Sequence, residues 1–294
     1  MKKHFLSLVA PVKDEDAYLI EFVNYYLLQG VERFYFYNND SETPLTETLR
    51  DYLDVCTIVP FPGSGVQYPC YAHFCATFKH ETEWLAVFDI DEFILPHRHE
   101  TLCRFLHDYA DVDGIGINWV MFGDGHHATP PAGKVIESYL YREAEQHDCI
   151  KSVIRTDKLL AIDHSHYARL EPGATYVDAR FNPIGSAYNR HQTTDIIQLN
   201  HYFTKSAEEY HHKIYRRRRV DDGLRRVDHE EDLVWLLDRN EKYNVIRETL
   251  IVDKYGKALD EQINARSASA KTSHAATKRL ANEVSGSDKE ASSI

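Results

Sequence analysis

Two aspartates, Asp89 and Asp91, are separated by one apolar residue and directly follow the apolar segment 84–88. Carboxylates this close disfavour each other's ionisation unless a positive charge lies between them, and a divalent cation can supply that charge. Their hard oxygen atoms suit Mg²⁺ or Mn²⁺, which commonly share their coordination with substrate phosphates. The pair therefore predicts a metal site whose cation neutralises charge developing on a diphosphate leaving group.

Two other interpretations of residues 89–92 stay open. An Asp-x-Asp pair can be a solvated acidic turn that binds no ligand. It also follows a strand in haloacid-dehalogenase-like phosphatases, but there it normally lies on the first strand and is followed by x-Thr or x-Val. Here Glu92 and Phe93 follow the pair, and at least three predicted strands come earlier. The hydrophobic segments 84–88 and 93–96 on either side favour the metal site.

The segments that must position these carboxylates alternate between strand and helix patterns. Apolar or aromatic runs predict strands over 5–12, 31–37, 55–60, 84–88 and 114–122, and helical spacing predicts helices over 14–28, 45–53, 68–80 and 102–109. This alternation is typical of an α/β protein with a mainly parallel central sheet. Ligands of such sheets bind beyond the carboxyl ends of strands, which is where residues 89–92 lie.

The rest of the chain divides by composition. Residues 134–205 mix short strands and loops, whereas 206–222 and 229–260 have helical patterns. We expect a catalytic domain over 1–222 and a helical C-terminal extension over 223–264. Residues 265–294 are rich in Ser, Ala, Lys and Glu and predict a disordered tail. A length of 294 residues, 43% of them hydrophobic, suits one domain with an extension.

Charge and hydropathy restrict the partners and the location. The net charge of −12 argues against nucleic acid, because phosphate backbones attract basic proteins. We find no apolar run long enough to span a membrane, no cleavable signal pattern and an odd number of cysteines, five, so we expect a cytoplasmic protein with reduced thiols. The basic run Arg216–Arg219 is either a solvated helix face or a contact with anionic lipid headgroups or a lipid-linked acceptor at the inner face of the membrane.

Several segments in order resemble glycosyltransferases of family 2 and family 92. They are residues 9–15 with 30–41, the strand 84–93, Trp119–Gly123, Lys151–Arg155 and Asn200–Ser206, and the resemblance covers about residues 5–220. It implies a GT-A fold, which is a Rossmann-like nucleotide-diphospho-sugar transferase fold. It also implies metal-dependent, inverting transfer of a hexose from a nucleotide diphosphate sugar, expected to be UDP-linked, to a hydroxyl of a glycan or glycolipid.

The same resemblance implies roles for individual residues. His201 stands where many GT-A enzymes carry a late histidine that completes the metal coordination, and neutral imidazole is a suitable ligand for Mn²⁺. Asn39 stands where relatives carry an Asp in a turn that meets the base, and its amide can both donate and accept. Pro11 and Val12 would line the same base pocket. For His201 the alternative is a core histidine, and the pair His164 and His166 is a second candidate.

The diphosphate and the acceptor need further groups. Lys151, Arg155 and Lys205 are candidates to contact the diphosphate, because a bound anion needs cationic donors. For the base that activates the acceptor hydroxyl, Asp124 is the favoured candidate, and other carboxylates are available at Glu92, Asp163, Asp178 and Asp195. Two other functions remain open: a metal-dependent phosphohydrolase, and a non-catalytic sugar-nucleotide or glycan-binding protein on a degenerate transferase fold.

Overall fold

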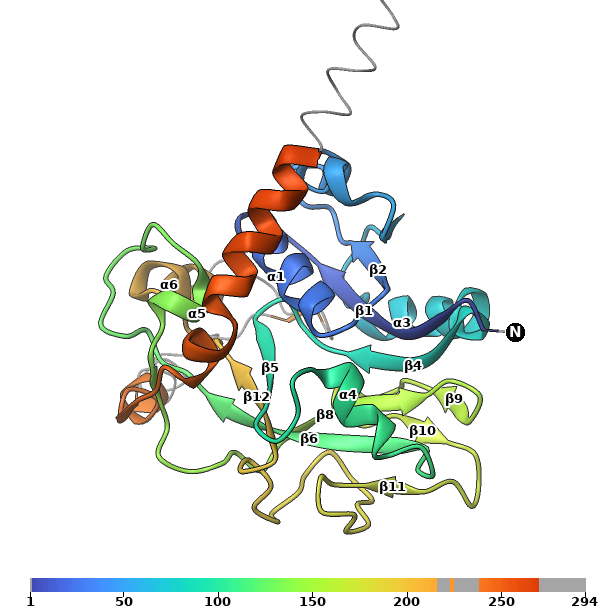
Figure 1. The fold of residues 1–294 in the computed structure, drawn as a ribbon. Helices are drawn as coiled ribbons and strands as arrows, with labels where there is room; N and C mark the ends of the chain where they lie inside the picture. The colour runs from blue at the N-terminus through green and yellow to red at the C-terminus, as the bar shows by residue number, and fades with distance from the viewer. Residues whose placement is uncertain (1, 216–222, 225–237, 270–294) are drawn as a thin grey trace, which may run out of the picture.

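The computed structural model describes residues 2–215, 223–224 and 238–269. Within these residues, nine strands form one large sheet in the order β3-β2-β1-β4-β8-β6-β12-β5, with β11 beside β6 (Figure 1). Their bounds are β1 His4–Val12, β2 Arg33–Asn38, β3 Cys56–Pro60, β4 Thr82–Val87, β5 Glu92–Pro96, β6 Gly114–Met121, β8 Ile150–Arg155, β11 Tyr176–Val177 and β12 Ile197–His201. Two small antiparallel sheets pair β9 Leu159–Ala161 with β10 Arg169–Leu170, and β7 Tyr141–Arg142 with β13 Ile246–Arg247.

The helices lie around this sheet. They are α1 Asp16–Leu28, α2 Leu45–Thr48, α3 Gln67–Thr77, α4 Leu102–His107, α5 Val135–Ser138 and α6 Ala207–Tyr215, followed by a long helix over residues 250–269, which we call the C-terminal helix. Strands β1, β2, β3 and β4 pair in parallel, as do β6, β11 and β12, whereas β5 and β8 run antiparallel to their neighbours. This mixed α/β architecture with a large, mostly parallel sheet confirms the predicted Rossmann-like fold class.

The sheet is buried on both faces, which explains why its strands consist of continuous apolar runs. Successive residues of β1 enter opposite cores, because side chains alternate along a strand. Leu8 and Ala10 pack with α1, whereas Val9 packs with Tyr71 and Phe74 of α3. The predicted elements between residues 5 and 60 are present, although the predicted helix 45–53 divides into α2 and a 3-10 turn at Arg50–Tyr52.

The end of the chain differs from the predicted helix over 229–260. Residues 246–247 form β13, and the C-terminal helix starts at 250 and continues to 269, beyond the predicted boundary at 264. Its buried side chains Ile251, Tyr255 and Leu259 belong to the main core, and the helix lies along α1 (Figure 1). There the Tyr255 ring packs against the Tyr25 ring. The helix is therefore built into the core. The division into domains stays a prediction, and residues 270–294 of the predicted tail lie outside the described part.

Candidate functional site

The acidic turn, which we define as Asp89–Glu92, connects the end of β4 with the start of β5. Strands β4 and β6 point toward the side of the molecule that carries α5 and α6 (Figure 1). Register brings distant residues to this edge: Glu92 pairs with His201 across β5 and β12, and His201 pairs with Met121 across β12 and β6. The backbone amide of Tyr202 donates to the carbonyl of Asp91 at 2.8 Å, which ties the turn to the end of β12.

One half of the turn is held by a buried lysine. The ammonium of Lys151 lies 2.8 Å from Oδ2 of Asp89 and 3.4 Å from Oε1 of Glu92, and its side chain is fully buried. Burial alone would lower the pKa of Lys151, but the two carboxylates outweigh it and raise that pKa. Glu92 also accepts from the Asp89 amide at 2.9 Å and from Nε1 of Trp119 at 3.0 Å. Lys151 therefore fixes the acidic turn from its buried side.

The other half of the turn faces a histidine and a second lysine. Oδ1 of Asp91 lies 3.5 Å from Nε2 of His201, and Oδ2 lies 2.8 Å from Nζ of Lys213 on α6. Burial would raise the pKa of Asp91, but Lys213 and His201 outweigh it and hold that pKa well below its usual value. Burial lowers the pKa of His201, which favours the neutral imidazole. Asp91 thus lies between the Lys213 ammonium and a histidine whose pKa is lowered by burial.

These residues fit a divalent cation in part. Asp91 and His201 converge, and Nδ1 of His201 is buried without a hydrogen-bond partner in the described part of the chain. Asp89 is directed to Lys151 instead. Across the described ranges, no group of three or more His, Cys, Asp or Glu side chains is arranged to hold a metal ion. The protein would supply two donors, and oxygen atoms of a bound diphosphate or water would supply the others, as is usual for Mg²⁺.

Rings line the edge beside the turn. Trp119 lies between His201 and His166, with ring centroids 4.3 and 4.6 Å away. Nδ1 of His166 donates to the carbonyl of Ile150 at 3.0 Å, and burial, assisted by the charge of Lys151, lowers the pKa of His166 to about 3. His166 is therefore neutral and packed, which favours a structural role over metal binding for this member of the second histidine pair.

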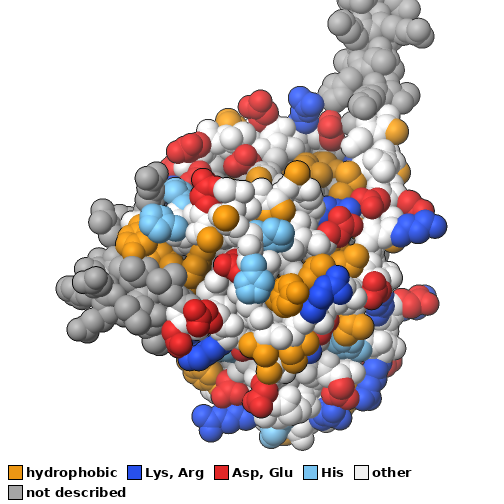
Figure 2. All heavy atoms as spheres, turned by 90° about the vertical axis from the view of Figure 1, so that its left-hand side faces the viewer, with side chains coloured by type: hydrophobic (Ala, Val, Ile, Leu, Met, Phe, Trp, Pro, Cys, Tyr) orange, Lys and Arg blue, Asp and Glu red, His pale blue; other side chains and the backbone are white. Residues whose placement is uncertain are grey.

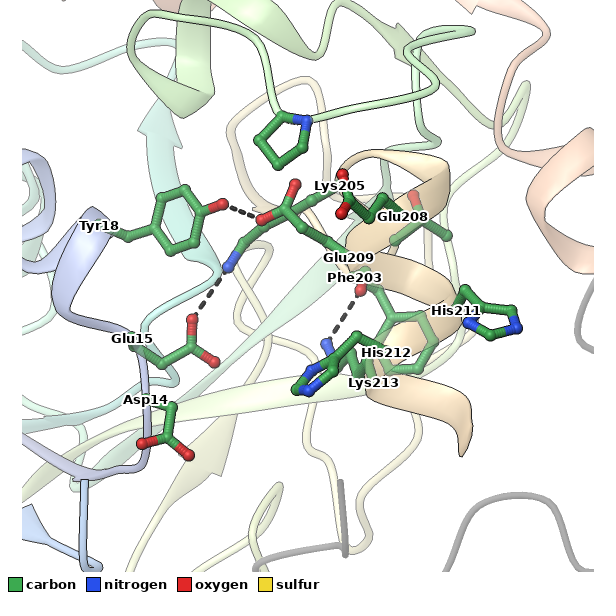
Figure 3. A pocket seen from close by; sticks show the side chains of 12 residues that line it. Asp14, Glu15, Tyr18, Phe203, Lys205, Glu208, Glu209, His211, His212 and Lys213 are labelled. Carbon is green, nitrogen blue, oxygen red and sulfur yellow. Dashed lines mark hydrogen bonds and ion pairs between the residues drawn. The ribbon is translucent and has the colours of Figure 1, made fainter. Parts of the chain in front are cut away.

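A cavity of about 460 Å³ opens next to the turn. Figure 2 faces this side and shows histidine side chains among hydrophobic ones near the middle of the surface. The cavity is lined by residues of α1, of α6, of the loops before these two helices and of the loop before α5: Asp14, Glu15, Tyr18, Pro130, Phe203, Thr204, Lys205, Glu208, Glu209, His211, His212 and Lys213 (Figure 3). Lys213 both lines this cavity and contacts Asp91, so the cavity lies next to the acidic turn.

Lys205 lies in this cavity, as expected for a residue that contacts an anion. Its ammonium is 3.0 Å from Oε2 of Glu15 and 3.5 Å from the centroid of the Tyr18 ring (Figure 3). Arg155 lies elsewhere: register pairs it with Trp84 at the start of β4, and its guanidinium contacts Glu83 at 3.2 Å. The acidic turn follows the other end of β4, so the position of Arg155 does not favour a diphosphate contact.

The residues expected to meet the base lie together at the ends of β1 and β2. Val12 is buried and its carbonyl accepts from the backbone amide of Asn39 at 2.8 Å. The Asn39 side chain donates to the carbonyls of Phe61 and Gly63, at 3.2 and 2.8 Å. Pro11, next to Val12, is half-buried. Asn39 thus shapes the loop after β3, and its predicted contact with a base stays a prediction.

Asp124, the favoured base, holds the C-terminal segment in place. Its carboxylate accepts from the side-chain amides of Asn240 and Asn244 at 2.8 and 2.9 Å and from the His126 backbone amide at 2.8 Å. The side chain is buried and does not line the cavity. These contacts give Asp124 a structural role and do not favour proton transfer. Of the other carboxylates considered, Asp163, Asp178 and Asp195 pair with Arg169, His191 and Arg180.

The sequence interpretation missed Lys213 and Trp119 as parts of the site. Lys213 was visible only as a residue preceding the basic run, which itself lies outside the described residues. One signal was present: Ser206 and Glu209 form a capping box that starts α6 directly after the His201 segment. A helix starting there places a lysine two turns later within reach of the strand end.

Comparison with known proteins gives a family. The model of Glycosyltransferase family 92 matches residues 4–239. Among curated proteins, a family 92 protein of Ricinus communis is 25% identical over 227 residues, which is 74% of this chain and 38% of that protein. Family 92 proteins of Oryza sativa subsp. japonica and Arabidopsis thaliana are 28% and 24% identical over 60% and 73% of this chain. The chain spans only 32–38% of the length of these relatives.

Solved structures are more distant. HddC from Yersinia pseudotuberculosis aligns with 60% of this chain and 89% of its own at 9% identity and a TM-score of 0.37. A UDP-glucose pyrophosphorylase complexed with UDP-glucose aligns with 70% of this chain and 95% of its own at 10% identity and a TM-score of 0.28. Likeness at this level is too low to support an inference about ligands.

Proposed function

This chain belongs to glycosyltransferase family 92, and we propose that it transfers a hexose from a nucleotide diphosphate sugar, with UDP as the nucleotide, to a hydroxyl of a glycan or glycolipid with inversion. One observation carries the proposal beyond the family. Asp91 and His201 converge at the carboxyl ends of β4 and β12, beside a cavity that is lined by two lysines. This combination suits a cation together with a diphosphate.

Asp91 and His201 would hold Mn²⁺ or Mg²⁺, which supplies charge stabilisation to the departing diphosphate when bound. Lys205 and Lys213 line the same cavity and can donate charge-assisted hydrogen bonds to phosphate oxygens. Asp89 carries the second carboxylate of the turn, and its side chain is 34% exposed, so it remains accessible to the donor while Lys151 fixes its position. We assign Lys151 to positioning, because it is fully buried.

We place the remaining parts of the donor and acceptor sites at the neighbouring strand ends and in the cavity. Pro11, Val12 and Asn39 lie at the neighbouring strand ends, where the base of the nucleotide would bind. Among the carboxylates that line the cavity, Glu208 is exposed, so it is better placed than Asp124 to take the proton of an acceptor hydroxyl.

The test is calorimetric binding of UDP, GDP and TDP, with and without Mn²⁺, to the wild type and to Asp91→Asn. We expect Mn²⁺-dependent binding of UDP that is largely lost in the variant, because the amide removes the anionic ligand. Asp163→Asn is the matched control, because Asp163 pairs with Arg169 on the surface. This variant should bind UDP as the wild type does. Absence of nucleotide binding under every metal condition would remove the basis of the proposal.

A second measurement separates the alternatives. Release of UDP from a UDP-sugar that rises with added glycan acceptor supports a transferase. Release of phosphate or nucleotide without any acceptor would indicate a phosphohydrolase, and tight binding without turnover would indicate a binding protein.

Location stays a prediction. No helix among the described residues is both long and apolar enough to cross a bilayer. The cytoplasmic location and the membrane contact through Arg216–Arg219 are untested, and that basic run lies outside the described part of the chain.

A further inference from the structure

Lys213 has an unusual position, because one ammonium serves both the acidic turn and the cavity. Its Nζ lies 2.8 Å from Oδ2 of Asp91 and 2.9 Å from the carbonyl of Phe203, and 4.0 Å from the centroid of the Phe203 ring. Figure 3 shows this side chain directed from α6 along the cavity wall toward Phe203. The side chain that neutralises Asp91 therefore also borders the space that a ligand of the cavity would occupy.

The two lysines of the turn differ in burial. Lys151, which neutralises Asp89, is 0% exposed, whereas Lys213, which neutralises Asp91, is 17% exposed and lines the cavity. A fully buried ammonium cannot leave its carboxylates without a large desolvation cost. An ammonium at a cavity wall can turn toward another anion, because water and ligand oxygens can replace its partner.

The attachment of α6 permits such a change. The start of the helix is fixed by the capping box of Ser206 and Glu209, and Glu209 also accepts from Tyr139 at 3.0 Å and from Tyr18. Past this turn, Tyr210 and Ile214 form a small hydrophobic cluster with Phe203, separate from the two main cores. The position of Lys213 is thus set by a helix whose first turn is anchored, and its long side chain can reorient without moving that anchor.

A divalent cation on Asp91 and the Lys213 ammonium would compete for the same carboxylate. A cation bound by Asp91 would lie close to the Lys213 ammonium, and two positive charges at one carboxylate repel. A donor diphosphate in the same cavity brings the negative charge that can receive the displaced ammonium.

We propose that Lys213 is an exchangeable counter-ion: it holds Asp91 while no divalent cation is bound, and it turns to the donor diphosphate when the cation takes Asp91. The inference rests on the proposed function, because it assumes that this site binds a cation and a nucleotide diphosphate. It adds a consequence that a fixed structural ion pair would not have. Lys213 must oppose binding of the metal alone and favour binding of the nucleotide with metal.

The experiment measures Mn²⁺ alone and then UDP at saturating Mn²⁺ on the wild type, Lys213→Met and Lys213→Arg. Lys213→Met should bind Mn²⁺ alone on the order of tenfold more tightly, since the competing charge is gone. The same variant should bind UDP with Mn²⁺ on the order of tenfold more weakly, since a charge-assisted hydrogen bond is lost. Lys213→Arg keeps the charge and should restore both affinities toward the wild type.

Lys158→Met is the matched control for the metal-only measurement. Its ammonium pairs with Glu171 at the surface instead of with Asp91, so Mn²⁺ alone should bind as it does to the wild type. Thermal unfolding confirms that each variant is folded, and Lys213→Gln replaces Lys213→Met if that variant does not fold.

The outcomes separate this inference from the function on which it rests. Unchanged Mn²⁺ affinity in Lys213→Met, or a loss of both affinities together, overturns the counter-ion role while wild-type binding of UDP keeps the proposed function. If the wild type binds neither Mn²⁺ nor UDP with Mn²⁺, both proposals fail.

Discussion

Replacing Lys151 by methionine should destabilise the protein by an amount that depends on pH. The change removes the only ammonium that the described residues place between Asp89 and Glu92, at 2.8 and 3.4 Å from their oxygens. Asp89 is partly exposed and keeps some solvation, but Glu92 is fully buried. Breaking a buried ion pair from one side typically costs about 3–5 kcal/mol, because a charge is left without a partner.

Protonation of Glu92 gives a second way to calculate the loss of unfolding free energy in Lys151→Met. Burial, with the charges of Asp89 and Asp91, raises the pKa of Glu92 even against the opposing charge of Lys151, so loss of Lys151 raises this pKa further and the carboxyl takes up a proton. Holding a proton at pH 7 on a carboxyl whose ordinary pKa is 4.5 costs about 1.4 kcal/mol per pH unit, or about 3.4 kcal/mol. We therefore expect Lys151→Met to lose about 3–4 kcal/mol of unfolding free energy at pH 7.

The sign of the pH dependence follows. A carboxyl whose folded pKa is raised contributes stability that is present at low pH and lost as the pH rises. The deficit of Lys151→Met should therefore shrink by about 2–3 kcal/mol when the pH is lowered from 7 to 5.

Urea unfolding followed by circular dichroism at pH 5, 6 and 7 measures this deficit. Lys3→Met is the matched control, because Lys3 forms an exposed ion pair with Glu81 that should contribute about 0–1 kcal/mol. If Lys151→Met does not fold, the double variant with Glu92→Gln should restore part of the stability by removing the buried charge. A deficit below about 1 kcal/mol at pH 7, or one that does not change with pH, would refute the reasoning.

Three further predictions concern other parts of the molecule. Burial raises the pKa of Glu21 to about 7, so wild-type unfolding free energy should fall between pH 5 and 8 by about 2 kcal/mol more than that of Glu21→Gln in urea titrations. Asp124→Asn should lose about 1–3 kcal/mol of stability in the same assay, because one of the two oxygens that accept from Asn240 and Asn244 becomes an NH₂ donor. If Asp124 were instead the catalytic base, the variant would lose turnover at unchanged stability. Leu259→Ala should lower stability by about 2–5 kcal/mol by opening a cavity under the C-terminal helix, and a thermal midpoint equal to that of the wild type would contradict this.

Local patterns were sufficient to predict the fold class. Strand β4, the acidic turn and helix α1 each follow from one continuous stretch of residues, so their type and order could be predicted from spacing. Strand β5 was missed because Glu92 was assigned to the acidic turn and residues 93–96 were interpreted as its hydrophobic flank. The strand β13 was missed because helical spacing continued through its two residues, which pair with β7 about a hundred positions earlier.

The site was predictable only where its residues are local or repeat a family pattern. Asp91 and His201 were proposed together and the structure brings them together, but their function as metal ligands stays a prediction. The opposite positions of Lys151 and Arg155 were not predictable, although the two residues share one strand. Their separation depends on the direction and register in which β8 pairs with β4, and sequence spacing does not determine either.

The mixed direction of the sheet explains where the site residues lie. At one edge of such a sheet, the carboxyl ends of strands running one way meet the amino ends of strands running the other way. Accordingly, Asp89 follows the end of β4 and His201 is the last residue of β12. Glu92 and Lys151, in contrast, lie at the starts of β5 and β8. Two antiparallel strands in an otherwise parallel sheet thus bring a buried lysine and a buried glutamate to the same end of the sheet as Asp89 and His201. The end of β8, with Arg155, must then lie at the opposite edge. The two lysines that we propose as donor contacts therefore lie outside the sheet, Lys205 in the loop after β12 and Lys213 on α6.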